Sequence, residues 1–437
     1  MDALSLLRER RFGPLFATQF FGAFNDNLYK NALVILLTFQ TVQWTTMKVD
    51  TLTNLAMGLF MLPFFLFSAT SGMLADKFDK ARIARISKVL EIVIILIAGA
   101  GFALHHLGIL LVALFLMGLQ STLFGPVKYA LLPQHLRPEE LVQGNAMVEA
   151  ATFISILLGT LAGGILADTK NGPVWIMLGS MTVAILGYLS SRAIPPAPAP
   201  SPHLKLNFNP VTETWRCIGF ARENRPVLLA VLGISWFWLY GSVMLAQFPN
   251  FTKSILGGQG SMATFLLTIF ALGIGGGSLL CGKLSRERPN LRFTFLGGVG
   301  MTLFGLDLAW ASTLVPGVPE TPLAVLLQEP TIWRVLVDLL GLGLSGGLYG
   351  VPLYTLMQQE SNPACRARVI AANNILNSFF IVLAAIVAMF LLSRGWSIPR
   401  LFTTVTILNL LVVVCGGVWA RSGAKVEQLT QPRSPAP

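Results

Sequence analysis

Long apolar stretches separated by short polar segments dominate the chain. A helix that spans a bilayer needs roughly 20 mostly apolar residues. The sequence contains twelve stretches of this kind, near residues 12–40, 51–75, 83–104, 107–132, 139–167, 173–192, 226–254, 261–283, 291–314, 331–359, 366–393 and 397–420. The pattern therefore predicts an all-α membrane protein with twelve transmembrane helices.

A polar interruption divides these stretches into six and six. Residues 194–202 read Ile-Pro-Pro-Ala-Pro-Ala-Pro-Ser-Pro, which is typical of a semi-rigid linker. Residues 208–225 are more amphipathic, which favours a position on the membrane surface. We therefore predict an N-terminal six-helix bundle over 1–192, a linker over 193–225, a C-terminal bundle over 226–420 and a tail over 421–437.

The two halves repeat each other. Segment 123–134 aligns with segment 348–359 at a constant spacing of 225, and the alignment resumes in the following helix after a three-residue shift. The matched pairs are Gly125 with Gly350, Tyr129 with Tyr354, Leu131 with Leu356, Gln134 with Gln359, Asn145 with Asn373, and Glu149 with Asn377. A parallel six-helix repeat is a known transporter plan, in which the substrate site lies between the halves near the bilayer midplane.

Composition and charge agree with a membrane protein. Of the 437 residues, 54% are hydrophobic and only 12% are charged, whereas soluble chains average about 25% charged residues. The net charge of +11 does not indicate a nucleic-acid surface, because most Lys and Arg residues fall in the termini and in alternate loops. By the positive-inside rule, both termini and the linker are predicted to be cytoplasmic. The four cysteines form no CxxC motif and are expected to be free thiols.

The first apolar stretch carries the chemistry that points to transport. Asp26 and Lys30 lie one helical turn apart within it, among Asn25, Asn27 and Asn31. Charges inside a membrane are costly and usually face the interior of the bundle, where they mark a substrate or ion path. The alternative is an Asp26–Lys30 pair that neutralises itself in a packed core.

Further candidate site residues lie in spans four, five and eleven. Gln120 and Lys128 share one helix face, although Lys128 lies close enough to the span end to snorkel to the interface. Asn145 and Glu149 share a face of span five, and their counterparts in the second half are the uncharged Asn373 and Asn377. The charges are thus kept in one half only. This is expected if one bundle binds a polar head or ion and the other supplies an apolar wall.

Other charged residues are expected to be structural or to control gating. Arg334 and Asp338, at i and i+4, are predicted to pair near the outer end of span ten, while Asp307 has no evident partner. Lys88 and Glu91 are predicted to pair locally.

The motifs for metal and nucleotide binding are not supported. The four histidines lack the spacing of metal ligands. The GxGxxG run at 341–346 lies in an apolar helix, where the glycines are expected to serve close helix packing. Neither a metal nor a cofactor is predicted.

The loop after span two resembles the loop signature of the major facilitator superfamily. Gly72 is followed at the fourth position by Asp76 and then by basic residues that include Lys80 and Arg82. A second copy begins at Gly277 and lacks the acid. The resemblance implies that Asp76 meets a helix N-terminus of the other half and holds the outward-open state.

Within that superfamily the chain resembles the bacterial lysophospholipid transporters. The resemblance is carried by segments 23–27, 126–129, 145–150 and 157–168, while Leu245 and Gln247 stand where some members have an arginine in span seven. It implies alternating-access flipping of lysophospholipids, such as lysophosphatidylethanolamine, across the bacterial inner membrane.

The implied partners are membrane lipid, the lysophospholipid substrate and a cytoplasmic acyltransferase, with no nucleic acid. An enzyme is not predicted, since none of the four histidines precedes an Asp at the spacing that acyltransferases use. The alternative function is a cation-coupled exporter of small solutes or drugs. For a lipid, we also expect a lateral opening between the bundles, sealed by close contacts at Gly159, Gly163, Gly275 and Gly276.

Overall fold

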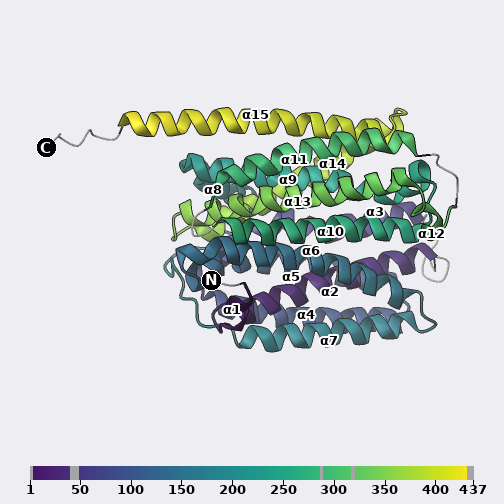
Figure 1. The fold of residues 1–437 in the computed structure, drawn as a ribbon. Coiled ribbons are helices and arrows are strands. Elements are labelled where there is room, and N and C mark those ends of the chain that lie inside the picture. Colours follow the sequence, from purple (N-terminus) through teal and green to yellow (C-terminus); the bar gives the residue numbers. More distant parts are fainter. Residues whose placement is uncertain (1–2, 40–48, 286–288, 316–319, 431–437) are drawn as a thin grey trace.

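A computed structural model describes residues 3–39, 49–285, 289–315 and 320–430. Its described residues form twelve long helices, which run roughly side by side through the molecule (Figure 1). The first six are α2 (Gly13–Phe39), α3 (Val49–Lys77), α4 (Lys80–Ala103), α5 (Leu107–His135), α6 (Leu141–Ala167) and α7 (Gly172–Arg192). The other six are α9 (Arg225–Phe251), α10 (Gly260–Leu284), α11 (Leu291–Ala311), α13 (Pro330–Glu360), α14 (Arg366–Ser393) and α15 (Ile398–Thr430).

The predicted membrane spans are confirmed. Helix α2 differs from the other spans because polar residues interrupt its apolar sequence. Eleven helices of the described chain are long and apolar enough to cross a membrane on their own composition. Helix α2 is not among them, although its 27 residues reach about 40 Å and exceed the ~30 Å of a bilayer core. Its polar residues between Asn25 and Asn31 lower its hydropathy, and neighbouring helices shield them.

The helix packing repeats between the halves. Helix α3 packs on α5 as α10 packs on α13, and α2 packs on α6 as α9 packs on α14. The α4–α5 and α4–α7 contacts likewise recur as α11–α13 and α11–α15. The halves meet through two equivalent contacts, α3 with α14 and α6 with α10. The predicted arrangement of two six-helix bundles is therefore confirmed.

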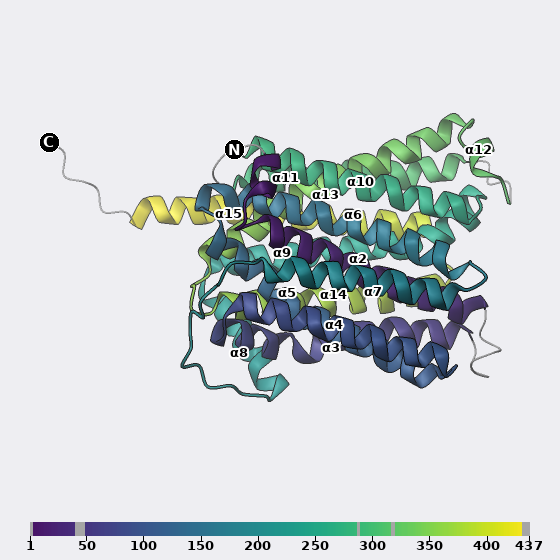
Figure 2. The ribbon, with the colours of Figure 1, turned by 90° about the horizontal axis from the view of Figure 1, so that it is seen from below.

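The start of α1 (Ala3–Arg8) and the end of α15 lie at the same end of the helices, together with the linker and α8 (Pro210–Glu223) (Figures 1 and 2). We call this end the linker side, and the end with α12 (Leu323–Leu326) the far side. Helix α15 continues to Thr430, so the segment predicted as a tail from 421 begins as an extension of this helix. Residues 431–437 lie outside the described part.

Two of the glycines predicted to seal a lateral opening pack elsewhere. A Cβ at Gly159 would lie 2.3 Å from the Phe24 carbonyl oxygen, and one at Gly163 would lie 2.6 Å from that of Leu28. Both glycines therefore let α6 approach α2 within the first bundle, and their assignment to a seam between bundles is wrong. Gly275 does face the other half, where its nearest neighbours are Ala150 and Ile154 of α6.

Candidate functional site

The polar segment of α2 does not form the self-neutralising pair that the sequence allowed. The Ser121 hydroxyl of α5 donates to the Asp26 carboxylate at 2.5 Å, and the second carboxylate oxygen of Asp26 is buried without a hydrogen-bond partner. The Lys30 ammonium donates instead to Asn27, at 3.0 Å, and lies 5.1 Å from the centre of the Phe60 ring. One oxygen of the Asp26 carboxylate is thus held in place by Ser121, and the other is buried without a hydrogen-bond partner.

A buried polar network lies behind Asp26. Lys88 and Glu91 are paired at 2.6 Å with side chains 1% exposed, which confirms the predicted local pair. Asn25 donates to Glu91 at 2.6 Å, and Gln120 donates to Ser87 at 2.8 Å and to Glu91 at 3.5 Å. Gln120 therefore faces α4 rather than the space between the bundles, and its assignment to substrate binding is corrected to a supporting role.

Lys128 and Glu149 bring opposite charges together on α5 and α6. Lys128 is half-buried, with its ammonium 4.7 Å from the centre of the Tyr129 ring. Its charge interacts with those of Glu149 and Asp26. Glu149 is 2% exposed, and its Oε1 atom has no hydrogen-bond partner. The ammonium of Lys128 therefore lies among protein groups, rather than snorkelling away from them.

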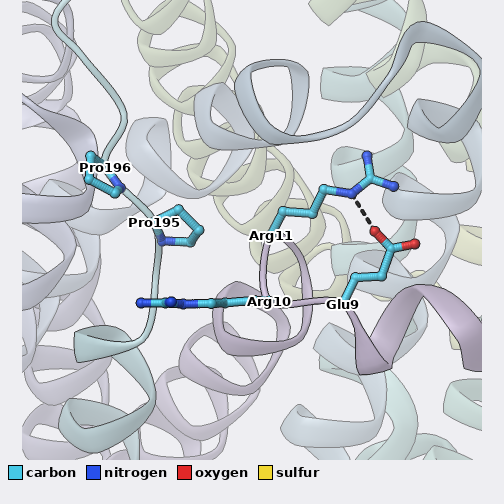
Figure 3. A pocket seen from close by; sticks show the side chains of 5 residues that line it. All are labelled: Glu9, Arg10, Arg11, Pro195 and Pro196. Carbon is cyan, nitrogen blue, oxygen red and sulfur yellow. Dashed lines mark hydrogen bonds and ion pairs between the residues drawn. The ribbon is translucent and has the colours of Figure 1, made fainter.

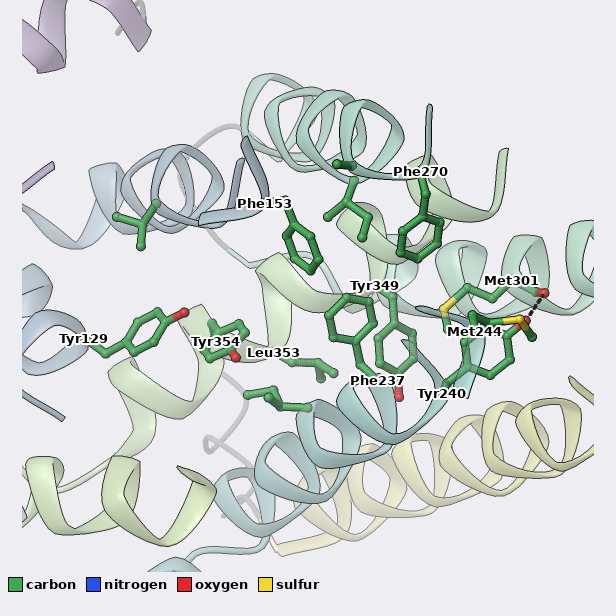
Figure 4. Packing of buried hydrophobic residues seen from close by; sticks show 14 of the residues in the cluster. Tyr129, Phe153, Phe237, Tyr240, Met244, Phe270, Met301, Tyr349, Leu353 and Tyr354 are labelled. Carbon is green, nitrogen blue, oxygen red and sulfur yellow. Dashed lines mark hydrogen bonds between the residues drawn. The ribbon is translucent and has the colours of Figure 1, made fainter. Parts of the chain in front are cut away.

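Aromatic side chains from both halves meet in this region (Figure 4). Tyr129 stacks on Tyr354, with ring centroids 4.8 Å apart and planes 9° apart. The Trp238 indole donates to the Tyr354 hydroxyl at 2.9 Å, and Phe153 stacks on Trp238 at 6.0 Å. These contacts give an aromatic wall opposite the charged residues of the first half. The sequence repeat identified Tyr129 and Tyr354 as equivalents but gave no signal that they touch.

The remaining asparagines are separated by the fold. Asn145 and Gln358 form a reciprocal amide pair across the two halves, at 2.8 and 2.9 Å, so in this state Asn145 joins the halves, and its role in substrate binding stays a prediction. Asn377 accepts from Ser235 at 2.8 Å within the second half. Asn373 is fully buried, and its side chain lies against the Tyr354 hydroxyl. Each of the three asparagines therefore has a protein group as its neighbour.

The loop motif joins the halves as its sequence suggests. The Asp76 carboxylate accepts from the backbone of Ala367 at 3.1 Å and of Arg368 at 3.3 Å, at the N-terminus of α14. The Arg368 side chain adds an ion pair with Asp76 at 3.0 Å. Gly72 makes the approach possible, because a Cβ there would lie 2.7 Å from that of Ala371. We call Asp76 and its α14 partners the latch.

The two basic motif residues differ in environment. Lys80 is 2% exposed, its charge interacts with Asp76, and its backbone donates to Ala197 of the linker. Arg82 has an exposed side chain, and its backbone N–H is capped by Asp79 at 2.8 Å. Lys80 is thus close to the latch, while the Arg82 side chain is directed to the surface.

The expected Arg334–Asp338 pair is wrong. Arg334 binds Asp307 of α11 through two hydrogen bonds, at 2.5 and 2.9 Å, and stacks on Trp310 at 4.3 Å. Asp338 is buried, with one carboxylate oxygen lacking a hydrogen-bond partner. Since α11 and α13 belong to the same half, the Arg334 ion pair braces one bundle and does not span the gap between the two.

A surface pocket of about 520 Å³ lies far from these residues, between the chain start and the linker (Figure 3). It is lined by Glu9, Arg10, Arg11, Pro195 and Pro196. Arg11 is engaged, because it binds Glu9 and also holds Glu140 through two hydrogen bonds. Asp26 lies 13 residues, or about 20 Å, along α2 from its start at Gly13, so this pocket is not part of the candidate site.

The comparisons with known proteins agree with this architecture. Residues 15–385 match the family described as Major Facilitator Superfamily. The chain belongs to the major facilitator superfamily.

Curated relatives of this facilitator are similar along most of its length. The Lysophospholipid transporter LplT of Klebsiella pneumoniae subsp. pneumoniae is 26% identical over 366 residues, which is 82% of both chains. The protein of the same name from Cronobacter sakazakii is 25% identical over 94% of this chain and 96% of its own.

Solved structures share the fold. The human organic anion transporter MFSD10 superimposes with a TM-score of 0.72 at 12% identity, covering 92% of this chain and 99% of its own. The Escherichia coli fucose:proton symporter FucP gives 0.68 at 12% identity, covering 93% and 98%. The family match, the transporter relatives and the eleven apolar helices of the described chain show that this facilitator is a multi-pass membrane transporter.

The contacts that join the halves of this facilitator lie toward the linker side. They include the latch, the Asn145–Gln358 pair, and a bond from Gln359 to the carbonyl of Pro138. Each lies near the linker-side ends of its helices, since α3 ends at Lys77, α6 begins at Leu141 and α13 ends at Glu360. The structure is thus closed on the linker side.

The second copy of the loop motif closes the equivalent seam without a charge. Cys281 stands where the first copy has Asp76, and it packs with Val142 and Ala146 of α6. A Cβ at Gly282 would lie 2.8 Å from that of Ala146, so this facilitator has close backbone approach at both seams. Within the described residues, the ion pair at these two seams is the one between Asp76 and Arg368.

Proposed function

We propose that this facilitator moves lysophospholipids between the leaflets of the bacterial inner membrane by alternating access. The observation that carries the proposal is the opposition of a charged wall and an aromatic wall. Asp26, Lys128 and Glu149 come from the first half, and Trp238 and Tyr354 come from the second. The names of the relatives, which match over most of the chain, supply the substrate class.

The charges suit a zwitterionic head group. The head of lysophosphatidylethanolamine carries a phosphate anion and an amine cation, so a site needs both signs to replace the lost water. Lys128 supplies the cation for the phosphate. Glu149 and Asp26, each with a carboxylate oxygen that has no hydrogen-bond partner, supply acceptors for the amine. The single acyl chain would lie along the apolar second half or in lipid.

The closed side is assigned to the cytoplasm by charge. Most Lys and Arg residues fall in the termini, the linker and the loops at the same end of the helices, and such residues favour the cytoplasmic side. Closure of the linker side would then correspond to an outward-open state held by the latch. Rocking of one bundle against the other would open the linker side and deliver the lipid to the cytoplasmic leaflet, where an acyltransferase could use it.

The test is transport of labelled lysophosphatidylethanolamine in proteoliposomes. Glu149→Gln and Lys128→Gln should each lower the initial rate by about tenfold or more, because each removes a charge-assisted contact to the head group. Lys170→Gln, in the exposed loop between α6 and α7, is the matched control and should transport at the parental rate. Parental rates for both site variants would place the head-group site elsewhere.

Competition distinguishes the lipid transporter from the exporter of small solutes. Unlabelled lysophosphatidylethanolamine should inhibit uptake far more strongly than glycerophosphoethanolamine, which has the same head and no acyl chain. Equal inhibition by the two compounds would favour the cation-coupled exporter.

A further inference from the structure

Linker helix α8 has three distinct faces. Its inner face contains Glu213, Cys217 and Ala221, which are at most 1% exposed. These positions recur at i, i+4 and i+8, as one face of a helix requires. A second face begins just before the helix and contains Phe208, Val211 and Trp215, which are 68%, 64% and 66% exposed. A third, polar face contains the exposed Thr212, Arg216 and Glu223.

The inner face covers a seam between the bundles. Cys217 packs with Ala69 of α3 on one side and with Ala372 and Ile375 of α14 on the other. The same face reaches the latch, because the Phe220 ring lies 4.4 Å from the guanidinium of Arg368, which in turn binds Asp76. Helix α8 is therefore packed onto a joint that must come apart if the linker side opens.

The apolar face of α8 points away from the bundle. Helix α8 lies at the edge of the molecule next to α3 (Figure 2). Where the two meet at Ala69, α3 is about 12 Å from its own linker-side end. At this depth α3 still presents Phe65 and Phe67 outward, at 45% and 36% exposed. The apolar face of α8 is thus continuous with the lipid-facing surface of α3.

Cations border this apolar face. Arg222 lies seven residues after Trp215, so its exposed side chain falls on the same side of the helix. Lys205 and Arg216 are also exposed on the flanks, and Arg216 is tied by a 2.7 Å bond to the buried Glu213. An apolar strip with an interfacial Trp and bordering cations is the pattern of a helix that lies in the head-group layer of an anionic membrane.

We propose that the apolar face of α8 docks in the head-group layer of the linker-side leaflet, and that anionic lipid there holds the inner face of α8 against the latch. The membrane composition would then bias the equilibrium between the two states of the facilitator. The proposal concerns gating and goes beyond the proposed function, because it holds for any substrate.

The first test measures the depth of α8 in proteoliposomes containing phosphatidylglycerol. Single spin labels are placed at Val211 and Trp215, with Thr212 and Glu223 of the polar face as matched controls. The first two labels should be more accessible to oxygen, which concentrates in lipid, and the controls to a water-soluble nickel complex. Water accessibility at Val211 and Trp215 equal to that of the controls would overturn the proposal.

The second test uses Cys217 as a reporter of the seam. Burial raises the pKa of the Cys217 thiol to about 12, so the thiol is protonated and unreactive while α8 is seated. The protein carries Cys415→Ser, which removes the exposed cysteine, and mass spectrometry follows maleimide addition at Cys217. Modification should be about fivefold slower in vesicles with phosphatidylglycerol than in phosphatidylcholine alone.

The matched variants separate the membrane contact from a general loosening. Trp215→Asp should raise the Cys217 modification rate and remove its dependence on anionic lipid, whereas Thr212→Asp should leave both unchanged. Modification that is independent of lipid charge in the parental protein, or equal effects of the two Asp variants, would overturn the proposal. Neither result would bear on lysophospholipid transport, which is measured separately.

Discussion

The Asp26 carboxylate owes its position to a hydroxyl group on another helix. The pattern of charges in the first apolar stretch predicted Asp26 as a site residue, but Ser121 carried no comparable signal. A lone serine in an apolar helix usually bonds to its own backbone, as Ser190 does to Leu186. Only the packing of α5 against α2 shows that the Ser121 hydroxyl instead donates to Asp26.

Removal of the Asp26 charge and of its hydrogen bond should have graded effects on transport. Asp26→Asn should reduce the rate by about a hundredfold and Ser121→Ala by about tenfold, as expected for the loss of a charge-assisted contact and for the loss of its orientation. Both variants should still insert, since neither adds a charge to the span. Ser190→Ala is the control, and proteoliposome uptake is the measurement. A Ser121→Ala protein with the parental rate would contradict the orienting role.

The buried Lys88–Glu91 pair gives a stability prediction. Lys88→Met strands the Glu91 carboxylate in a site that is 1% exposed, which should lower the free energy of unfolding by about 3 kcal/mol. The double variant Lys88→Met with Glu91→Gln should recover much of this loss, because Gln keeps an acceptor for Asn25 and carries no charge. Thermal unfolding in detergent measures both. Equal loss in the single and double variants would argue against charge burial as the cause.

Sequence spacing predicts an ion pair only when both partners lie on one helix and neither has a partner on another helix. Lys88 and Glu91 are three residues apart, so geometry alone favoured their contact. Arg334 and Asp338 had the same local advantage, yet Arg334 binds Asp307 across the α11–α13 interface. Asp307, on a neighbouring helix, thus takes the place of Asp338 as the partner of Arg334. Sequence spacing carries no information about a partner on another helix.

At the scale of elements, apolar runs predicted the helices closely because the membrane thickness limits both. Span eleven was predicted at 366–393 and is observed at Arg366–Ser393. The exceptions have a physical cause. Helix α15 continues past the predicted end of the apolar run, since a helix that leaves the bilayer is not limited by hydropathy. Helix α2, which the apolar stretch at 12–40 did predict, is less apolar than the other spans because of its polar segment.

The latch gives a prediction about the balance between states. Asp76→Asn removes the ion pair with Arg368 and the charge at the N-terminus of α14, so it should favour opening of the linker side. Spin labels at Leu104 and Trp333, exposed on opposite halves at the far side, should then move closer together. Asp79→Asn is the control, because Asn also caps a helix N-terminus. An unchanged distance distribution would remove the latch from the mechanism.

At the scale of the whole molecule, the two halves have the same helix arrangement, but the candidate charged site residues lie in the first half. The repeat was visible in the sequence, and it predicted which helices correspond. It could not predict which equivalent residues would meet each other or pair across the seam. Asn145 was predicted to face substrate and instead closes on Gln358, because the structure is shut on the side where α6 begins.

Orientation in the membrane follows from the distribution of charge over the whole chain. A cysteine introduced by Lys205→Cys should react with an impermeant maleimide only after the cells are permeabilised, because the linker is predicted to be cytoplasmic. The parallel site on the far side, Lys48, lies outside the described residues, and Lys48→Cys should react in intact cells. Reaction of the Lys205→Cys protein in intact cells would invert the topology.

The stacked tyrosines have a consequence for the history of this chain. Tyr129 and Tyr354 are equivalent positions of the repeat, and equivalent positions touch only on the axis that relates the two copies. Such self-matching contact is the mark of an isologous homodimer interface. A six-helix ancestor that paired with itself would have used one tyrosine for both sides. After fusion, a substitution could alter one side alone, which is the asymmetry that Glu149 and Asn377 now display.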